Sequence, residues 1–320
     1  MNESIEKKND FPLLTVVVPC FNEEEVINQF HLRLLSSIEK LGSNYEVIYV
    51  SDGSTDKTNE LIANIVSNCK NNQIKFISFS RNFGHQIAVS AGIDYASGRA
   101  VVLIDADLQD PPELIHEMIQ KWKEGYHVVY CQREKREGES LFKIISSSLF
   151  YKVLAILSDV KIPIDTGDFR LMDRRVVDEL KNMPEKDRFI RGMVSWVGFK
   201  QFALKYKRDE RYAGVSKYPF WKMVRFAIDG ILSFSNKPLK FATFIGFLSS
   251  FLSLIGITYA IVMWITGEPV LGWTLMFITL LFFGGVQLIT LGIIGEYIGR
   301  SYVESKRRPL YIIGKKLGFK

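Results

Sequence analysis

Short apolar runs alternate with helix-like segments through the N-terminal part of the chain. Continuous apolar stretches predict buried strands at 13–19, 45–52, 74–80, 100–107 and 127–132. A helical pattern follows each of the first four, and the last of these helices is expected to begin near Pro111, since proline suits a first turn. Apolar strands separated by helices predict an α/β domain with a mostly parallel sheet that is covered on both faces.

Two longer apolar runs, at 241–265 and 271–295, contain no charged residue. Each exceeds the roughly 20 residues that a helix needs to cross the hydrocarbon core of a bilayer. Their connector, "TGEPV", is short, so the two runs predict an antiparallel transmembrane hairpin. The alternative is a pair of buried helices in a soluble protein, which is disfavoured because such helices rarely stay uncharged over this length.

Basic residues flank both ends of this predicted hairpin, whereas its connector has none. They are Lys237, Lys240, Arg300, Lys306, Arg307, Arg308, Lys315 and Lys316. The positive-inside rule therefore places both termini and the large N-terminal domain on the cytoplasmic side, which predicts a two-span protein of the cell inner membrane. Gly295 and Gly299, with the pair Gly284–Gly285, would allow close helix approach within the hairpin or in a homo-oligomer.

Two further stretches, 139–157 and 217–234, combine apolar residues with lysine or arginine. Both suit amphipathic helices in the lipid headgroup layer; ordinary core-facing helices are the alternative, and an equal match for 139–157. The predicted organisation is a cytosolic α/β domain at 1–216, a juxtamembrane amphipathic helix at 217–239, two transmembrane helices at 240–299 and a basic cytosolic tail at 300–320.

Composition narrows the class of partner. The 320 residues carry a formal net charge of +6, and 13% of them are aromatic. A mild basic excess suits nucleic acid, an anionic membrane surface or phosphorylated small molecules, and the aromatic content favours the membrane. Cys20, Cys69 and Cys131 are too widely spaced, and odd in number, for a disulfide framework or a zinc site. The polar stretch "MNESIEKKND" lacks the apolar segment of a signal peptide.

Ligands of parallel α/β sheets bind beyond the carboxyl ends of the strands. The strand ends here carry "PCFNEE" (19–24), "SDGSTD" (51–56), "SRNFGH" (80–85) and "DADLQD" (105–110). A dinucleotide-binding Rossmann enzyme would have G-x-G-x-x-G after its first strand. The stretch at 19–24 contains no glycine, which argues against a dehydrogenase of that class.

The stretch "DADLQD" is the strongest candidate for chemistry. Asp105 and Asp107 are two residues apart at a strand end, so both can reach the same edge of the sheet. With the amide oxygen of Gln109 they offer hard oxygen ligands suited to Mg²⁺ or Mn²⁺, whose shell phosphate oxygens and water would complete. An acidic turn that caps the next helix is the alternative. At the second strand end, Asp52 can accept hydrogen bonds from a base or ribose, although such a turn is weak evidence alone.

Five motifs together resemble glycosyltransferase family 2, which has the GT-A fold. They are "VVVPCFNEEE", "VSDGSTDKT", "FSRNFGHQIAVSAGIDYASG", "VVLIDADLQDPPE" and "DTGDFRLMDRRVV", in this order, within residues 13–215. The branch that the chain resembles is the polyisoprenyl-phosphate glycosyltransferases, which include bactoprenol glucosyltransferase and dolichol-phosphate mannose synthase. The two predicted C-terminal spans match the bacterial members that have a membrane hairpin.

The resemblance implies a donor site at the strand ends. The positions that match the family's first nucleotide-contacting segment are Pro19, Phe21 and Glu23, and Asp52 matches the residue that holds the base. The positions that match the segment for the diphosphate and its metal are Asp105, Ala106, Asp107 and Gln109.

The resemblance also implies a set of residues near the transferred sugar and the acceptor. Arg133 matches an arginine near the diphosphate and the acceptor phosphate, and Asp168 lies in a segment that lines the sugar pocket. The residues that match a mobile basic segment over the donor are Arg188, Arg191, Arg211 and Lys217. Asp168 and Arg133 are the predicted catalytic residues, with Asp168 as a general base or as an orienting group.

The reaction implied by the resemblance is the inverting transfer of a sugar from a nucleotide diphosphate sugar to a polyprenyl (undecaprenyl) phosphate. The product would be a lipid-phosphate-linked sugar for modifying a surface glycan or polymer, made at the cytoplasmic membrane face. UDP-glucose is the expected donor by family frequency, and mannose from GDP-mannose or an aminoarabinose derivative stays open. No nucleic acid partner is expected.

Two other functions fit the sequence less well. A processive polysaccharide synthase would carry a Q-x-x-R-W segment and more spans, and the chain has no such segment. A non-catalytic membrane scaffold built on a degenerate transferase domain would be expected to lose the acids at the strand ends, whereas Asp52, Asp105 and Asp107 are all present.

Overall fold

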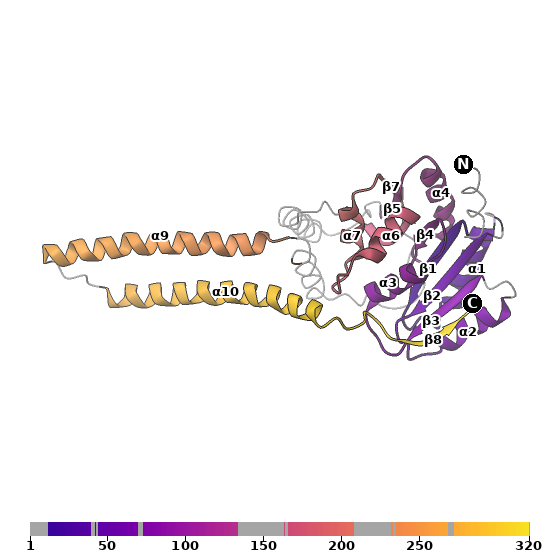
Figure 1. Cartoon of the computed structure of the whole chain (residues 1–320), viewed down its shortest axis with the longest axis horizontal. Coiled ribbons are helices and arrows are strands. Elements are labelled where there is room, and N and C mark those ends of the chain that lie inside the picture. Colours follow the sequence, from indigo (N-terminus) through magenta and orange to yellow (C-terminus); the bar gives the residue numbers. More distant parts are fainter. Residues whose placement is uncertain are drawn as a thin grey trace, which may run out of the picture. The chain divides into compact units, whose positions relative to one another are not determined.

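A computed structural model describes residues 12–39, 42, 44–69, 73–133, 163, 166–207, 232, 235–267 and 272–319 (Figure 1). The chain forms two compact units. The sheet unit comprises Met1–Tyr151, Val160–Phe220 and Arg308–Lys320, and the helix unit comprises Lys152–Asp159 and Trp221–Arg307. The amphipathic helix expected at 139–157, nearly all of the one expected at 217–234, and residues 268–271 at the hairpin connector lie outside the described residues.

The described part of the sheet unit contains an eight-stranded sheet with the order β7-β5-β6-β4-β1-β2-β3-β8. The strands are β1 (Leu14–Cys20), β2 (Tyr45–Ser51), β3 (Ile74–Phe79), β4 (Ala100–Leu103), β5 (Val128–Arg133), β6 (Thr166–Asp173), β7 (Gln201–Tyr206) and β8 (Ile313–Leu317). Parallel pairing joins β3, β2, β1 and β4 in a row, and β5 with β7. The sheet is therefore mostly parallel around the predicted strand ends.

The five predicted strands are all present, and three further strands were not predicted. β6 lies between β4 and β5 and is antiparallel to both. Its sequence, "TGDFRLMD", does not read as an apolar strand, although Asp168 and Arg170 are buried within it. A fully buried strand is recognised in a sequence by a continuous apolar run. The charged residues Asp168 and Arg170 interrupt that run, so the strand was not predicted.

Helices cover the sheet on both faces. They are α1 (Ile27–Ile38), α2 (Thr58–Asn68), α3 (His85–Tyr95), the 3₁₀ helix η3 (Pro112–Leu114), α4 (Ile115–Lys123), α6 (Arg174–Asn182) and α7 (Ile190–Val197). Phe30 of α1 packs into the same core cluster as Val16 and Val18 of β1. On the opposite face, a Cβ at Gly92 of α3 would lie 2.0 Å from Val17, so only glycine allows α3 to approach β1 so closely.

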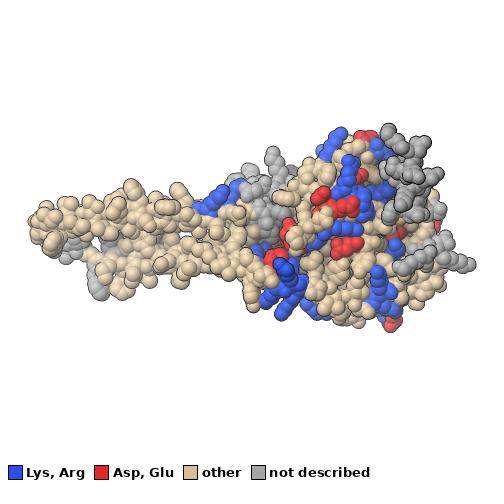
Figure 2. All heavy atoms as spheres, viewed as in Figure 1, with Lys and Arg blue, Asp and Glu red and all other residues tan. Residues whose placement is uncertain are grey.

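The helix unit contains α9 (Lys237–Thr266) and α10 (Trp273–Ser305), which run side by side (Figure 1). Their apolar windows have mean hydropathies of 2.0 and 2.2 and are not buried. Both helices are long and apolar enough to cross a bilayer, and their surface in Figure 2 is almost free of charged side chains. These features fit the predicted hairpin, and α10 continues well beyond residue 295.

The glycines singled out for close helix packing have open surroundings. A Cβ at Gly284, Gly285, Gly295 or Gly299 would meet no atom within 4 Å among the described residues. The packing of α9 against α10 therefore does not depend on these small residues. An oligomer that uses them stays a prediction.

The C-terminal residues differ from the separate basic tail expected at 300–320. Residues up to Ser305 continue α10, and Ile313–Leu317 form β8, which pairs antiparallel with β3 at one edge of the sheet. The sequence "IGKKL" reads as polar because an edge strand exposes one side, and charged residues such as Lys315 and Lys316 are common there.

Candidate active site

The strand ends after β1 and β2 are joined by hydrogen bonds. The side-chain oxygen of Asn22 accepts a bond from the Thr55 amide at 2.9 Å, and the Glu23 amide donates to the Thr58 hydroxyl oxygen at 2.8 Å. Pro19 is buried within β1, whereas Phe21 is 42% exposed. This edge of the predicted nucleotide site is thus a rigid double turn that presents one aromatic ring to solvent.

Asp52, at the end of β2, binds the backbone of the next strand end. Its carboxylate accepts bonds from the Phe83 amide at 2.6 Å and from the Gly84 amide at 2.9 Å. Burial raises the pKa of Asp52, although these amides and the charges of His85 and Arg81 oppose the rise. Asp52 therefore orders residues 80–84, which the sequence did not indicate; its predicted contact with a base stays a prediction.

Gly53 makes this arrangement of the two strand ends possible. Its φ is +67°, and a Cβ there would lie 2.3 Å from the carbonyl carbon of Arg81. Any other residue would collide with backbone that cannot move without displacing the bonds to Asp52. The glycine that the sequence indicated as a turn residue is therefore also a point of close contact between two strand ends.

Asp105 follows β4 and has a carboxylate oxygen without a hydrogen bond. Its Oδ1 is buried and accepts none from the described residues, and it lies 3.7 Å from Nε2 of His85. Burial raises the pKa of Asp105 to about 6; His85 opposes this rise, and the carboxylates of Asp168, Asp110 and Asp107 add to it. The side chain of Asp105 is 29% exposed, and its buried Oδ1 lacks a donor among the described residues. With three acidic neighbours, such a carboxylate fits a site for a positively charged ligand.

The rest of the "DADLQD" stretch folds into a compact turn. The Gln109 amide donates to Oδ1 of Asp107 at 3.1 Å, and Leu108 adopts a φ of +59°. Ala106 and Gln109 are almost fully buried. Asp110, which was read only as part of the acidic run, is fully buried and accepts a hydrogen bond from the Tyr206 hydroxyl.

The residues after β4 fit a divalent metal, although the predicted set is not a complete protein site. Among the described residues, no group of three or more His, Cys, Asp and Glu side chains is placed to hold a metal ion. Asp105 offers a buried oxygen without a donor, and the carboxylate of Asp107 lies two residues away. Two carboxylates suit Mg²⁺ or Mn²⁺ when phosphate oxygens supply further ligands.

Asp168, on β6, is surrounded by donors. It accepts bonds from Nε2 of His85 at 3.0 Å, from Nε2 of Gln86 at 3.0 Å and from Nε of Arg191 at 2.8 Å. Burial favours a raised pKa, but Arg191 and His85 hold the pKa of Asp168 well below its usual range. A carboxylate with such a low pKa is a weak base at neutral pH, so this geometry favours the orienting role over the general base.

His85 lies between the two acidic positions and was not singled out by the sequence. Burial lowers its pKa, but the charge of Asp105 and the hydrogen bond to Asp168 raise the pKa of His85 to about 9. Its side chain is 45% exposed, so water screens part of this effect. The only signal was its place at the end of "SRNFGH"; a lone histidine there does not reveal its two carboxylate neighbours.

The predicted basic residues divide between two roles. Arg133 ends β5 beside β6, where a Cβ at Gly167 would lie 2.9 Å from its Nη2, and it hydrogen-bonds Tyr206. Arg191 contacts Asp168, as described above. Arg188 is instead buried among backbone carbonyls and donates to those of Leu180, Met183 and Glu185, beyond α6 and within its last turn.

Arg188 was assigned to the donor site, and the structure places its guanidinium in the connection between α6 and α7 instead. Free carbonyls at a helix end need donors, which is the role that Arg188 fills. Arg211 and Lys217 lie outside the described residues.

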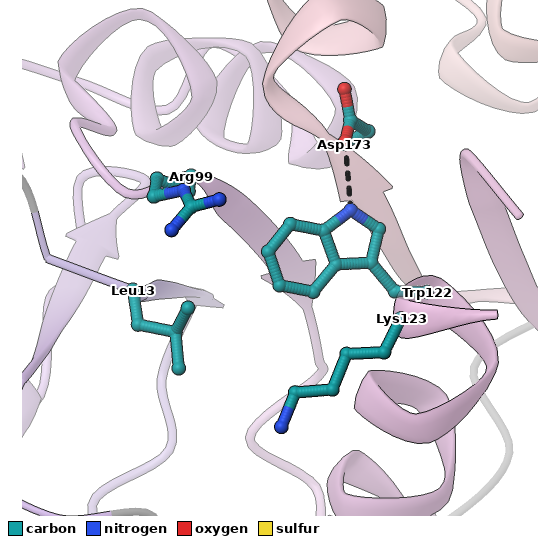
Figure 3. A pocket seen from close by; sticks show the side chains of 5 residues that line it. All are labelled: Leu13, Arg99, Trp122, Lys123 and Asp173. Carbon is teal, nitrogen blue, oxygen red and sulfur yellow. Dashed lines mark hydrogen bonds between the residues drawn. The ribbon is translucent and has the colours of Figure 1, made fainter. Parts of the chain in front are cut away.

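The opposite edge of the sheet contains a cavity that is separate from this cluster. It has a volume of about 330 Å³ and is lined by Leu13, Arg99, Trp122, Lys123 and Asp173 (Figure 3). The Trp122 indole donates to Asp173 at 2.7 Å (Figure 3). Leu13 precedes β1 and Arg99 precedes β4, so this cavity lies at the amino ends of those strands, where α/β sheets rarely bind ligands.

Comparison with known proteins gives matches across the chain. Residues 15–181 match the family model described as glycosyl transferase family 2. The chain is 52% identical, over 307 residues, to the uncharacterized glycosyltransferase YkcC of Bacillus subtilis (strain 168), which covers 95% of this chain and 94% of that protein. It is 42% identical, over 301 residues, to the bactoprenol glucosyl transferase of Shigella phage SfV, covering 94% and 97%.

A solved structure that is similar to this chain is the mannosyltransferase PcManGT from Pyrobaculum calidifontis, in complex with GDP-Man and Mn²⁺. The match has a TM-score of 0.49 and 18% identity, and it covers 70% of this chain and 64% of that one.

Proposed function

The chain belongs to glycosyl transferase family 2, and from that premise we propose that it transfers one sugar from a nucleoside diphosphate sugar to a polyprenyl phosphate. The GT-A fold and glycosyl transfer follow from the family. The acceptor is proposed because the relative from phage SfV is named bactoprenol glucosyl transferase and aligns along almost the whole chain, including α9 and α10. By the same relative, UDP-glucose is the first donor to test, before GDP-mannose and an aminoarabinose derivative.

One observation within the site carries the proposal. The buried Oδ1 of Asp105 accepts no hydrogen bond from the described residues, yet it lies among three other carboxylates and beside His85. Such an arrangement is unfavourable unless a ligand completes it. A diphosphate that arrives with a divalent cation would add positive charge beside these carboxylates and would itself bind the neighbouring cations.

Asp105 and Asp107 are the residues that would hold Mg²⁺ or Mn²⁺, with Gln109 buried in the same turn. When bound, the ion supplies positive charge that stabilises the departing nucleoside diphosphate. Arg191 and His85 add fixed positive charge, because both are hydrogen-bonded to Asp168 and cannot swing freely.

The chemistry proposed for the acceptor needs little help from a base. A phosphate monoester is already anionic at neutral pH, so its oxygen can attack the anomeric carbon without first losing a proton. The bond from that carbon to the acceptor oxygen forms as the bond to the diphosphate oxygen breaks, which inverts the anomeric centre. Asp168 then acts by orienting Arg191 and His85. Arg133, at the end of β5, would bind a phosphate of the donor or acceptor.

The helix unit supports a membrane location for the proposed reaction. The acceptor has a lipid tail, and α9 and α10 are apolar over a length that suits a bilayer. The flanking basic residues favour a cytoplasmic position for both termini and the sheet unit, in the inner membrane of the cell. A test of this orientation is labelling of cysteines introduced near residue 268 and near the N-terminus in intact cells.

The experiment that tests the function uses membranes that contain the full-length protein. They are incubated with undecaprenyl phosphate and labelled UDP-glucose, GDP-mannose or other nucleotide sugars, with and without EDTA. We expect one donor to give a lipid that carries a single sugar, and EDTA to remove the product. No labelled lipid with any donor would refute the acceptor, and a growing polymer would indicate a polysaccharide synthase instead.

Two alanine variants of aspartates, one inside the proposed metal site and one outside it, provide a matched control for this experiment. Asp107→Ala removes a proposed metal ligand, and we expect turnover to fall by about 10²-fold or more. Asp178→Ala removes an exposed carboxylate of α6 that pairs with Arg174 at 3.4 Å, and we expect turnover to stay unchanged. Full activity in the Asp107 variant at equal expression would remove the metal from the proposal.

A further inference from the structure

The residues that follow α10 return to the sheet unit and lie along β3. We name residues 308–319 the C-terminal arm. Phe76 pairs with Leu317 and Phe79 with Ile313, and the Ser80 amide donates to the Ile312 carbonyl at 3.0 Å. Because β8 is antiparallel to β3, the first residues of the arm lie at the carboxyl end of β3, which is the edge that holds the candidate active site.

Aromatic rings connect the arm to that edge. The Tyr311 ring stacks on Phe79 with the centroids 5.1 Å apart, and its hydroxyl donates to Asp94 of α3 at 2.9 Å. Phe79 in turn meets Phe83 edge to face at 5.6 Å. Such ring pairs stabilise a structure beyond the burial of their area, so Tyr311, Phe79 and Phe83 form one packed series.

Phe83 belongs to the loop that Asp52 binds. We name residues 80–84 the β3 loop. The Phe83 amide donates to Asp52, and the Arg81 guanidinium lies 3.9 Å from the Phe83 ring centroid. The loop ends at Gly84, directly before His85, whose ring contacts Asp168. The β3 loop is therefore held by Asp52 on one side and by the arm on the other.

We propose that the C-terminal arm is part of the nucleotide-sugar site, and that Tyr311 is a positioning residue for the nucleotide base. Tyr311 does not touch the donor in this proposal; it holds Phe79 and Phe83, and these fix the amides that orient Asp52. The identity of the ligand rests on the proposed function. The structural link, in which the arm holds the β3 loop in place, rests only on the contacts described above.

Reciprocity makes the proposal measurable in the unaltered protein. If the arm strengthens nucleotide binding, nucleotide binding must strengthen attachment of the arm by the same factor. Trypsin cuts after lysine and arginine except before proline, so its sites in the arm are Lys315 and Lys316, whereas Arg308 precedes Pro309. We expect UDP with Mn²⁺ to slow cleavage of the arm several-fold, and inorganic pyrophosphate with Mn²⁺, which has no base, to slow it less. Equal protection by UDP and by pyrophosphate would show that the arm does not help to position the nucleotide base.

Substitutions separate positioning from simple stability. Tyr311→Ala removes the ring, and we expect the Kd for UDP and the KM for the donor to rise about tenfold, which is about 1.4 kcal/mol. The kcat and the KM for undecaprenyl phosphate are expected to stay within about twofold, because the acceptor does not contact the β3 loop in this proposal. Tyr311→Phe keeps the ring and loses only the bond to Asp94, so it should restore most of the donor affinity.

The control is an aromatic residue with the same kind of bond at the other edge of the sheet. Trp122 donates to Asp173, as Tyr311 donates to Asp94, but it lies at the amino ends of the strands. Trp122→Ala should lower the melting temperature, as Tyr311→Ala does, and leave the donor KM unchanged. An equal rise of donor KM in both variants would show that Tyr311 acts only through stability.

Hydrogen exchange tests the contacts without any ligand. The Phe83 and Gly84 amides, which donate to Asp52, should exchange faster in Tyr311→Ala and at the normal rate in Trp122→Ala. Unchanged exchange together with unchanged UDP affinity would overturn the inference. Faster exchange in a protein whose wild type binds neither UDP nor GDP would refute the proposed donor and leave the link between arm and loop established.

Discussion

Two carboxylates at opposite edges of the central sheet, Glu46 and Asp105, have opposite surroundings. At the amino edge, Glu46 is 3% exposed and accepts bonds from Lys75, Thr15 and Ser97. At the carboxyl edge, Asp105 has a buried oxygen that accepts no bond from the described residues. Burial alone would raise both pKa values; the partners of Glu46 lower its pKa, whereas the pKa of Asp105 is raised to about 6.

The difference teaches how to tell a structural acid from a functional one in the same fold. A buried charge whose lone pairs are all used stabilises the folded chain, because removing any partner leaves a costly group behind. A buried charge that lacks donors destabilises the chain until a ligand arrives, and such groups concentrate at functional sites. The comparison thus supports Asp105 as part of the candidate site on physical grounds, whereas Asp168, at the same edge, has several donors and fits an orienting role.

The largest expected effect is on activity at the carboxyl edge. Asp105→Asn keeps the shape of the side chain and removes a charge that lacks a donor. We expect turnover to fall by about 10³-fold, because a ligand of the proposed metal is lost. The melting temperature at pH 7 should rise by a few degrees, roughly 1 kcal/mol, because repulsion from the neighbouring carboxylates is relieved. A lower melting temperature in this variant would contradict the comparison.

The opposite result is expected at the amino edge. Glu46→Gln leaves the Lys75 ammonium without its buried partner, and we expect a loss of about 3 kcal/mol in the free energy of unfolding. Turnover per folded molecule should stay unchanged, since this residue is far along the strand from the site. Denaturant titration of the detergent-solubilised protein measures the first quantity, and a single-donor assay measures the second. If fully folded Glu46→Gln protein lost most of its turnover, Glu46 could not be a purely structural carboxylate.

Two arginines close together in the sequence test the same difference between a residue of the site and a residue that stabilises the fold, with smaller expected effects. Arg191 binds Asp168, and Arg188 binds backbone carbonyls beyond α6. Arg191→Ala should lower kcat by about tenfold, or 1.4 kcal/mol. It should also lower stability, because the buried Asp168 loses one donor and keeps those of His85 and Gln86. Arg188→Ala should lower stability by about 1–3 kcal/mol, since buried carbonyls lose their donor, and keep the activity of the folded enzyme. A large loss of kcat in Arg188→Ala, with unchanged stability, would instead support the original assignment of Arg188 to the donor site.

The smallest expected effect is on the pH dependence of stability. The pKa of Glu46 is lower in the folded chain than in an exposed glutamate, so its ionised form stabilises the fold. That contribution is complete above about pH 5 and is lost as the pH falls through the lowered pKa. The stability advantage of wild type over Glu46→Gln should therefore be constant from about pH 7 to about pH 5 and shrink below. If the stability difference between wild type and Glu46→Gln grew as the pH fell, the pKa of Glu46 would be raised by folding and not lowered.

Local sequence signals were sufficient for strands β1 to β5 and for α1 to α4. Each of those strands is an apolar run, and a helical pattern follows each of the first four, with a proline signal before the last of these helices. The same signals missed β6, whose buried Asp168 and Arg170 interrupt the pattern, and β8, whose lysines resemble a tail. Burial of an ionic pair and pairing at an edge both depend on partners far away in the chain.

The sequence by itself determined the fold class, the apolar hairpin helices and the position of the acids at the strand ends, because these depend on residues close together in the chain. Only the tertiary structure decided which acids have partners. His85 and Asp168 are 83 residues apart, and Tyr311 and Asp94 are 217 residues apart, yet each pair forms a hydrogen bond. The protonation of a carboxylate and the rigidity of a loop follow from such contacts, because charge and packing act through space and not along the chain.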